Sequence, residues 1–141
     1  MYKFLLILVC GLFVSACNKD YSGDIEDYLA EKNLTAQKTD DGLYYIIDVP
    51  GNEIKPKLNS DVKVIYKGYL TNGTVFDEKT TAIEFNLSQV IAGWTRGIPL
   101  FGEGGKGKLI IPPSLGYGDT ENGTIPANSI LVFDIELVDV L

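Results

Sequence analysis

Histidine is absent from this chain of 141 residues, and cysteine occurs only twice. Nucleophilic sites of the Ser-His-Asp and Cys-His kinds need an imidazole base, so the sequence cannot build one. Structural zinc sites made of Cys and His are excluded for the same reason, and the acidic residues form no dense liganding loop for calcium. We therefore expect no metal and no cofactor, and an enzyme of this sequence must work without a nucleophile or a metal ion.

Positive charge is also scarce, because 12 Lys and Arg face 19 Asp and Glu, which gives a formal net charge of -7. Proteins that bind nucleic acid need clustered basic residues, and here these residues are scattered along the chain. We therefore expect no nucleic-acid partner. The length allows one folded domain with a single hydrophobic core and leaves no room for a second.

The N-terminal residues have the layout of a secretory signal. Lys3 precedes an apolar run over residues 4–14, and the chain turns polar directly after Cys17. The run is shorter than the roughly 18 residues that a membrane-spanning helix usually needs, which favours a cleaved segment over a permanent anchor or a buried helix. The sequence VSAC at 14–17 resembles the lipobox of bacterial lipoproteins, in which the cysteine is acylated and becomes the new N-terminus.

Cysteine usage agrees with this interpretation. Cys10 lies in the segment that would be removed and Cys17 would carry lipid, so no disulfide is expected within the mature chain. Several acyl chains hold a protein firmly at a bilayer. Residues 18–20 are similar to surface-export signals of some Bacteroidota lipoproteins. We therefore expect residues 1–17 to act as a lipoprotein signal, with a cell-envelope location, lipid-anchored to a membrane through Cys17. The outer membrane is favoured, on its periplasmic or surface face.

The rest of the chain divides into a polar stretch and a strand-rich region. Residues 18–41 are expected to form a tether with one short helix near 25–30. From 42 to 141, β-branched and aromatic runs bounded by Gly, Pro and Asn predict strands at 43–49, 62–70, 83–87, 109–111 and 130–141. A short loop is expected at 77–83, a helix at 92–98, and tight turns at Asn72-Gly73 and Asn122-Gly123. This pattern predicts an α+β fold, an antiparallel sheet with one short α-helix packed on it.

The glycine-rich stretch at 102–107 has the spacing of a dinucleotide-binding loop and nearly that of a P-loop. Both loops must open a helix so that its N-terminal N–H groups face the phosphates. Here the stretch leads into the strand-like residues 108–111, and Leu109 stands where a P-loop needs Ser or Thr. A flexible turn is the interpretation that remains.

Several motifs follow one another in a fixed order through the last hundred residues. They are VKVIYKGYL at 62–70, NGTVFD at 72–77, FNL at 85–87, VIAGW at 90–94, IPP at 111–113, LGYG at 115–118, IP at 125–126 and LVFDIEL at 131–137. In this order and spacing they resemble the FKBP-type peptidyl-prolyl cis-trans isomerases. The resemblance implies an antiparallel sheet of about five strands wrapped around one short helix, over residues 42–141.

The resemblance also implies a pocket for proline-containing polypeptides and for macrolide inhibitors, in a chain that we expect to be monomeric. Asp77 and Tyr117 would be the catalytic residues: Asp77 would accept a hydrogen bond, and the Tyr117 hydroxyl would donate one to a substrate carbonyl, as would the N–H of Ile91. Trp94 would form the floor. The substrate-binding walls would comprise Tyr66, Phe76, Phe85, Val90, Ile91, Tyr117, Ile125 and Phe133.

Such a pocket suits cis-trans isomerisation, because rotation about a prolyl amide breaks no bond. It removes only the C–N double-bond character, which causes a barrier of about 18–20 kcal/mol. The sequence departs from the family pattern at Ile83, where an aromatic is frequent, and at Thr124, where an aliphatic is common. The expected function is that of an isomerase that assists protein folding. Two alternative functions remain open. They are a chaperone or binding module without turnover, and a structural subunit of an envelope assembly.

Overall fold

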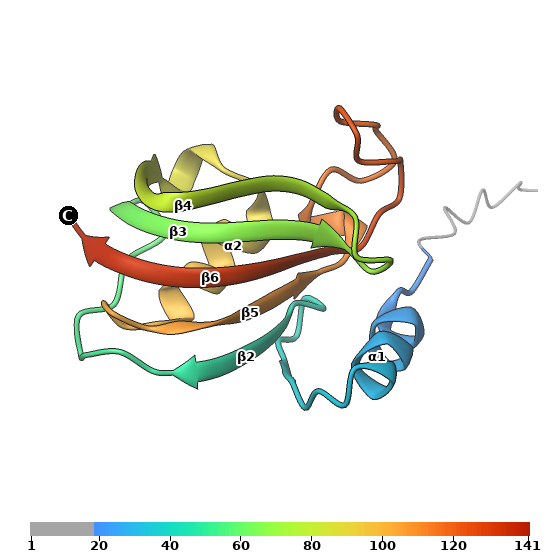
Figure 1. The fold of residues 1–141 in the computed structure, drawn as a ribbon, viewed down its shortest axis with the longest axis horizontal. Helices are drawn as coiled ribbons and strands as arrows, with labels where there is room; N and C mark the ends of the chain where they lie inside the picture. The colour runs from blue at the N-terminus through green and yellow to red at the C-terminus, as the bar shows by residue number, and fades with distance from the viewer. Residues whose placement is uncertain (1–18) are drawn as a thin grey trace, which may run out of the picture.

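One sheet of six antiparallel strands organises the computed structural model, which describes residues 19–141. The predicted signal and Cys17 lie outside the described residues. The strand order is β1-β2-β5-β6-β3-β4 (Figure 1). The sheet expected from the resemblance is confirmed, with the two-residue β1 as its sixth strand. The strands are β1 Gln37–Lys38, β2 Tyr44–Val49, β3 Asp61–Leu70, β4 Val75–Asn86, β5 Lys106–Ile111 and β6 Leu131–Val140.

The short helix α2, Ala92–Gly97, packs on the inner face of the sheet, and three 3-10 turns flank it or follow β5 (Figure 1). They are η1 Leu87–Gln89, η2 Ile98–Leu100 and η3 Pro113–Leu115. Every second residue of β3 from 62 to 70 is buried, because successive side chains of a strand point to opposite faces. The inward set joins the main apolar cluster together with Trp94 of α2.

The segment expected to be a tether is folded onto the domain. Residues Ser22–Glu31 form helix α1, which confirms the short helix, but its apolar face is buried on the outer side of the sheet. Ile25 is fully buried, and the Tyr44 hydroxyl donates to Glu26 at 3.0 Å. The polar residues that suggested a tether are the exposed face of this amphipathic helix, since one apolar stripe suffices to dock it. Residues 22–38, which include α1 and β1, are therefore part of the folded domain.

The expected loop at 77–83 is also absent, because β4 runs without interruption from Val75 to Asn86. It is an edge strand, and most of its residues up to 82 are exposed, so the alternation that reveals a strand is missing there. The pairing with β3 shifts between Val64 and Tyr66, which leaves residues 80–82 as a bulge.

Both predicted tight turns are confirmed. Gly73 has φ +90° in the β3–β4 turn, and Gly123 has φ +56° in a turn closed by hydrogen bonds between Asn122 and Ile125. Residues 102–105 of the glycine-rich stretch form a turn as well, and residues 106–107 begin β5. The backbone N–H groups of residues 102–105 each donate to a backbone carbonyl, and the chain then enters β5, so these groups are not free to hold a phosphate.

Candidate functional site

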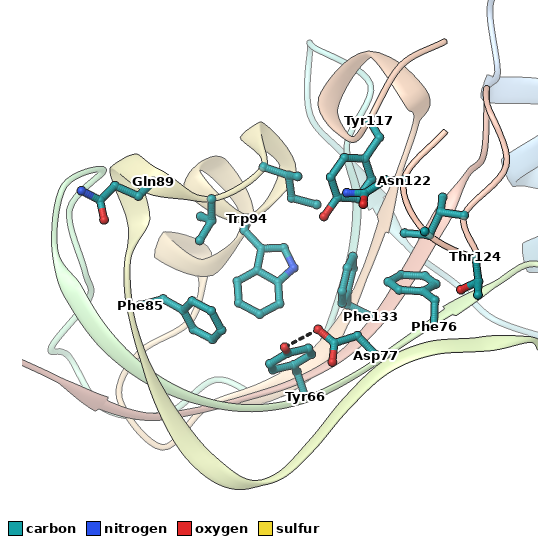
Figure 2. A pocket seen from close by; sticks show the side chains of 14 residues that line it. Tyr66, Phe76, Asp77, Phe85, Gln89, Trp94, Tyr117, Asn122, Thr124 and Phe133 are labelled. Atoms are coloured by element: carbon teal, nitrogen blue, oxygen red, sulfur yellow. Dashed lines mark hydrogen bonds between the residues drawn. The ribbon is translucent and has the colours of Figure 1, made fainter. Parts of the chain in front are cut away.

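A cavity of about 630 Å³ opens between the sheet, α2 and the segment that follows η3 (Figure 2). The ten residues that the sequence singled out for the pocket all line it. Gln89, Asn122 and Gly123, which the sequence motifs did not indicate as pocket residues, also line it, as does Thr124, one of the two departures from the family pattern. The full lining is Tyr66, Phe76, Asp77, Phe85, Gln89, Val90, Ile91, Trp94, Tyr117, Asn122, Gly123, Thr124, Ile125 and Phe133.

Trp94 lies at the centre of an aromatic cluster (Figure 2). Its ring centroid is 4.9 Å from that of Tyr66, 5.3 Å from that of Phe85 and 5.3 Å from that of Phe133, with interplanar angles of 86°, 82° and 80°. Edge-to-face pairs of this kind each contribute about 0.5–1.5 kcal/mol beyond the burial of their area. Only 4% of Trp94 remains exposed, so three neighbouring rings fix the indole in one orientation.

The indole N–H of Trp94 is buried and has no hydrogen-bond partner among the residues that the structure describes. A buried donor left unpaired destabilises a fold by about 1–3 kcal/mol. The surrounding rings offer only weak acceptor faces. This part of the pocket is therefore strongly apolar.

Gly68 of β3 makes room for the aromatic wall. A Cβ at this position would lie 2.6 Å from Cε2 of Phe76 and 2.7 Å from Cε1 of Phe133, which real side chains do not tolerate. The missing side chain lets both rings pack directly over the strand, at a centroid distance of 5.5 Å and an angle of 83°. Nothing in the local sequence identifies this glycine as part of the site.

A polar pair stands at one side of the apolar cavity. The Tyr66 hydroxyl donates to Oδ2 of Asp77 at 2.6 Å (Figure 2). Burial, followed by the hydrogen bond to the carboxylate and the charge of that group, raises the pKa of Tyr66 well above its usual value. The phenol is thus neutral throughout the neutral and mildly alkaline range. The contact retains its full contribution to stability below the ordinary tyrosine pKa of about 10 and loses it as pH rises through the raised value.

We expect kcat/KM to vary by less than about twofold between about pH 6 and 9, because the chain has no histidine to titrate there and Tyr66 stays protonated. Initial rates measured in buffers of constant ionic strength check this. A bell-shaped profile centred near neutrality would contradict it and would require a proton-transfer step.

Two further expected hydrogen-bond donors, Ile91 and Tyr117, also line the cavity. Ile91 precedes α2, and its carbonyl accepts from the N–H groups of Trp94 and Thr95. Its own N–H is not used within the helix, since the first N–H groups of a helix have no intrahelical partner. Tyr117, which is 37% exposed, stands at the mouth of the cavity. These positions agree with the donor roles expected of Ile91 and Tyr117, which stay predictions.

The two departures from the family pattern have different surroundings. Thr124 lines the cavity and adds a hydroxyl to its wall, whereas Ile83 packs against the main apolar cluster from β4. Gln89 and Asn122 place two carboxamides at the cavity (Figure 2). Gln89 directly precedes the motif at 90–94, and Asn122 belongs to the predicted turn at Asn122-Gly123. These positions were the available signal for them. Within residues 19–141, no group of three or more acidic or thiol side chains could hold a metal ion.

Residues 52–138 match the sequence profile of FKBP-type peptidyl-prolyl cis-trans isomerases. The chain belongs to this family. Several curated relatives are named FKBP-type peptidyl-prolyl cis-trans isomerase FkpA. That of Buchnera aphidicola subsp. Schizaphis graminum is 53% identical over 108 residues, which cover 73% of this chain and 42% of the relative. That of Aeromonas hydrophila is 45% identical over 118 residues, which cover 80% and 44%.

Solved FKBP-type structures agree with the fold. The crystal structure of FkpA from Escherichia coli superimposes with a TM-score of 0.77 at 38% identity, covering 86% of this chain and 59% of that one. A peptidyl-prolyl cis-trans isomerase from Pseudomonas syringae pv. tomato gives 0.74 at 31% identity, covering 87% and 97%. The FKBP-type chain spans less than half of the length of the two curated relatives.

Proposed function

We propose that this FKBP-type chain is a peptidyl-prolyl cis-trans isomerase that accelerates the folding of exported proteins. The observation that carries the proposal is the convergence of ten residues from four elements and two connecting segments on one apolar cavity with Tyr66 and Asp77 at its side. The uncatalysed reaction takes about 10–100 s, which is slow enough to limit folding.

The cavity can lower the barrier to rotation of the prolyl amide by stabilising the twisted amide relative to the planar one. A planar amide is charge-separated by resonance, and a twisted amide has lost this polarity. The buried rings around Trp94 and Phe133 replace water with apolar surface, which disfavours the planar form relative to the twisted one. The Ile91 N–H and the Tyr117 hydroxyl would hold the carbonyls that flank the bond. The same cavity would accept a macrolide inhibitor, whose binding the fluorescence of Trp94 would report.

Tyr117→Phe should lower kcat/KM by about tenfold without abolishing activity, because it removes one hydrogen bond worth about 0.5–1.5 kcal/mol. A protease-coupled assay on proline tetrapeptides with the full chain in a non-ionic detergent measures this. Tyr45→Phe is the matched control, since the Tyr45 hydroxyl donates to Gln37, away from the cavity. Complete loss of activity in a folded Tyr117→Phe variant would refute desolvation as the main mechanism.

The same assay separates the isomerase from the alternative function of a chaperone that only binds proline-containing segments. A binder would retain proline peptides in equilibrium titrations and leave the isomerisation rate unchanged. If the wild-type chain behaves in this way, the enzyme assignment must be given up.

We further propose that the mature chain is a monomer held at a membrane of the cell envelope by lipid on Cys17. Within residues 19–141, no helix is long and apolar enough to cross a bilayer. Helix α1 begins at Ser22 and packs on the sheet, so only residues 18–21 separate the lipidated cysteine from the folded domain. Four residues span at most about 14 Å, which would keep the domain close to the lipid headgroups.

Cys17→Ser should abolish the incorporation of radioactive palmitate and release the chain from membranes, because the acylated sulfur is removed. Labelling of cells followed by membrane fractionation measures both. Cys10→Ser is the control, since Cys10 would be removed with the signal, and its labelling should match the wild type. Equal labelling of the Cys17→Ser variant would overturn the lipid anchor.

A further inference from the structure

A second cavity, of about 660 Å³, lies at the end of the sheet that carries the β3–β4 turn. Its walls come from α1 and from Lys19 and Tyr21 just before it, from the turn at 70–72 and from the segment 126–130. Figure 1 shows α1 and the chain that leads into β6 at this same end of the sheet. We call this cavity the α1 groove.

The α1 groove combines an apolar base with an acidic wall. Tyr28 and Leu70 are 7% and 9% exposed and, together with the half-buried Ile130, form the base. The wall consists of Asp27 and Glu31, with Asp24 one turn earlier. Residues three and four apart share one face of a helix, so these carboxylates project from the same side of α1.

The carboxylates of the groove are largely uncompensated. Lys19 forms an ion pair with Asp24 at 3.1 Å. In the described part of the chain, Asp27 and Glu31 form no ion pair. The α1 groove therefore suits the side chain of a Lys or Arg, whose aliphatic stem can lie on Tyr28 while its charged end meets the two carboxylates.

The α1 groove and the isomerase cavity lie on either side of one short segment. Residues 122–125 line the isomerase cavity, and residues 126 and 128–130, next along the chain, line the groove. The β3–β4 hairpin separates the two cavities in the same manner, because residues 70–72 face the groove and residues 76–77 face the isomerase cavity. A polypeptide with its proline in the isomerase cavity can therefore enter the groove by crossing either this segment or the hairpin.

We propose that the α1 groove is a secondary docking site for the substrate polypeptide, which takes a Lys- or Arg-bearing segment a few residues from the isomerised proline. The proposal rests on the isomerase function proposed above and adds a preference for positively charged clients. The acidic groove would bind the flanking segment, so its contribution appears in KM and not in the rotation step.

The test compares three peptides that share one proline-containing core of four residues. One is the core alone, one extends it with lysines placed roughly three to eight residues from the proline on either side, and one carries glutamates at those positions. The full chain in a non-ionic detergent is assayed by NMR exchange, which needs no coupling protease that would cut at lysine. We expect the lysine peptide to have a KM about fivefold lower than that of the core at low salt, and the glutamate peptide to show no gain. The gain should shrink when salt shortens the Debye length to about 8 Å or less.

The double variant Asp27→Asn/Glu31→Gln should remove the gain for the lysine peptide and leave the rate on the core unchanged. The matched control is Asp48→Asn/Glu53→Gln, which removes the same charge from exposed positions outside the α1 groove. If the control variant removes the gain equally, the preference arises from net charge and the docking site is refuted. A lysine peptide with no gain in the wild type also refutes it. If the core itself is not isomerised, the proposed function fails first.

Discussion

Phe133→Ala is expected to lower the free energy of unfolding by about 3–5 kcal/mol, because a buried Phe leaves a large cavity when truncated. The side chain is 4% exposed, and its ring packs against those of Phe76, Trp94 and Tyr66. Loss of this ring opens the apolar wall to water and frees the indole on one side, so kcat/KM should fall by at least about tenfold. Urea denaturation followed by circular dichroism measures the stability, and the peptide assay measures the rate.

Two control variants distinguish a loss of activity caused by the altered cavity from one caused by unfolding of Phe133→Ala. Phe133→Leu retains most of the apolar volume and should keep more of both the stability and the activity. Val75→Ala truncates an apolar side chain that is 44% exposed on β4, and should change stability by no more than about 0.5 kcal/mol. If Phe133→Ala is folded and isomerises prolyl bonds at the wild-type rate, the cavity assigned here is not the catalytic site.

More of the site than of its surroundings could be predicted, because the site residues belong to motifs that follow one another in a fixed order along the sequence. Tyr66 and Phe133 sit on buried strands with strong alternation, and Trp94 directly follows Gly93 in a short helix. Their convergence on one cavity follows from the resemblance, which supplies the long-range pairing of β3 with β6 that local patterns lack. The roles of Tyr117 and Asp77 stay predictions until activity is measured.

Parts of the molecule whose structure depends on distant contacts were not predictable from local sequence. The sequence of helix α1 is mostly polar and is typical of a tether. Its place in the fold depends on the packing of Ile25 with Ile110 and Val132 on the outer face of the sheet. The exposed middle of β4 lacks an apolar period because it is an edge strand with a bulge at 80–82. The need for glycine at position 68 arises only from rings that approach across the sheet.

Gly93→Ala is expected to destabilise the protein by about 1–3 kcal/mol, the usual effect of overpacking a core. A Cβ at Gly93 would lie 2.6 Å from both Cδ1 and Cγ2 of Ile111, so α2 would have to move away from β5. Because Trp94 follows directly in the helix, this movement displaces the floor of the isomerase cavity. We therefore expect kcat/KM to fall together with stability.

The matched control for Gly93→Ala is the same substitution in α1. Gly23 is helical, and a Cβ there would meet nothing within 4 Å. Gly23→Ala should therefore stabilise the protein by up to about 1 kcal/mol through helix propensity, and leave activity unchanged. Both substitutions add one methyl group to a helix, and they differ in what that group contacts. If urea denaturation gives changes of opposite sign in the free energy of unfolding, the close contact between α2 and β5 requires Gly93. If Gly93→Ala is as stable and as active as Gly23→Ala, the position of α2 does not depend on this contact.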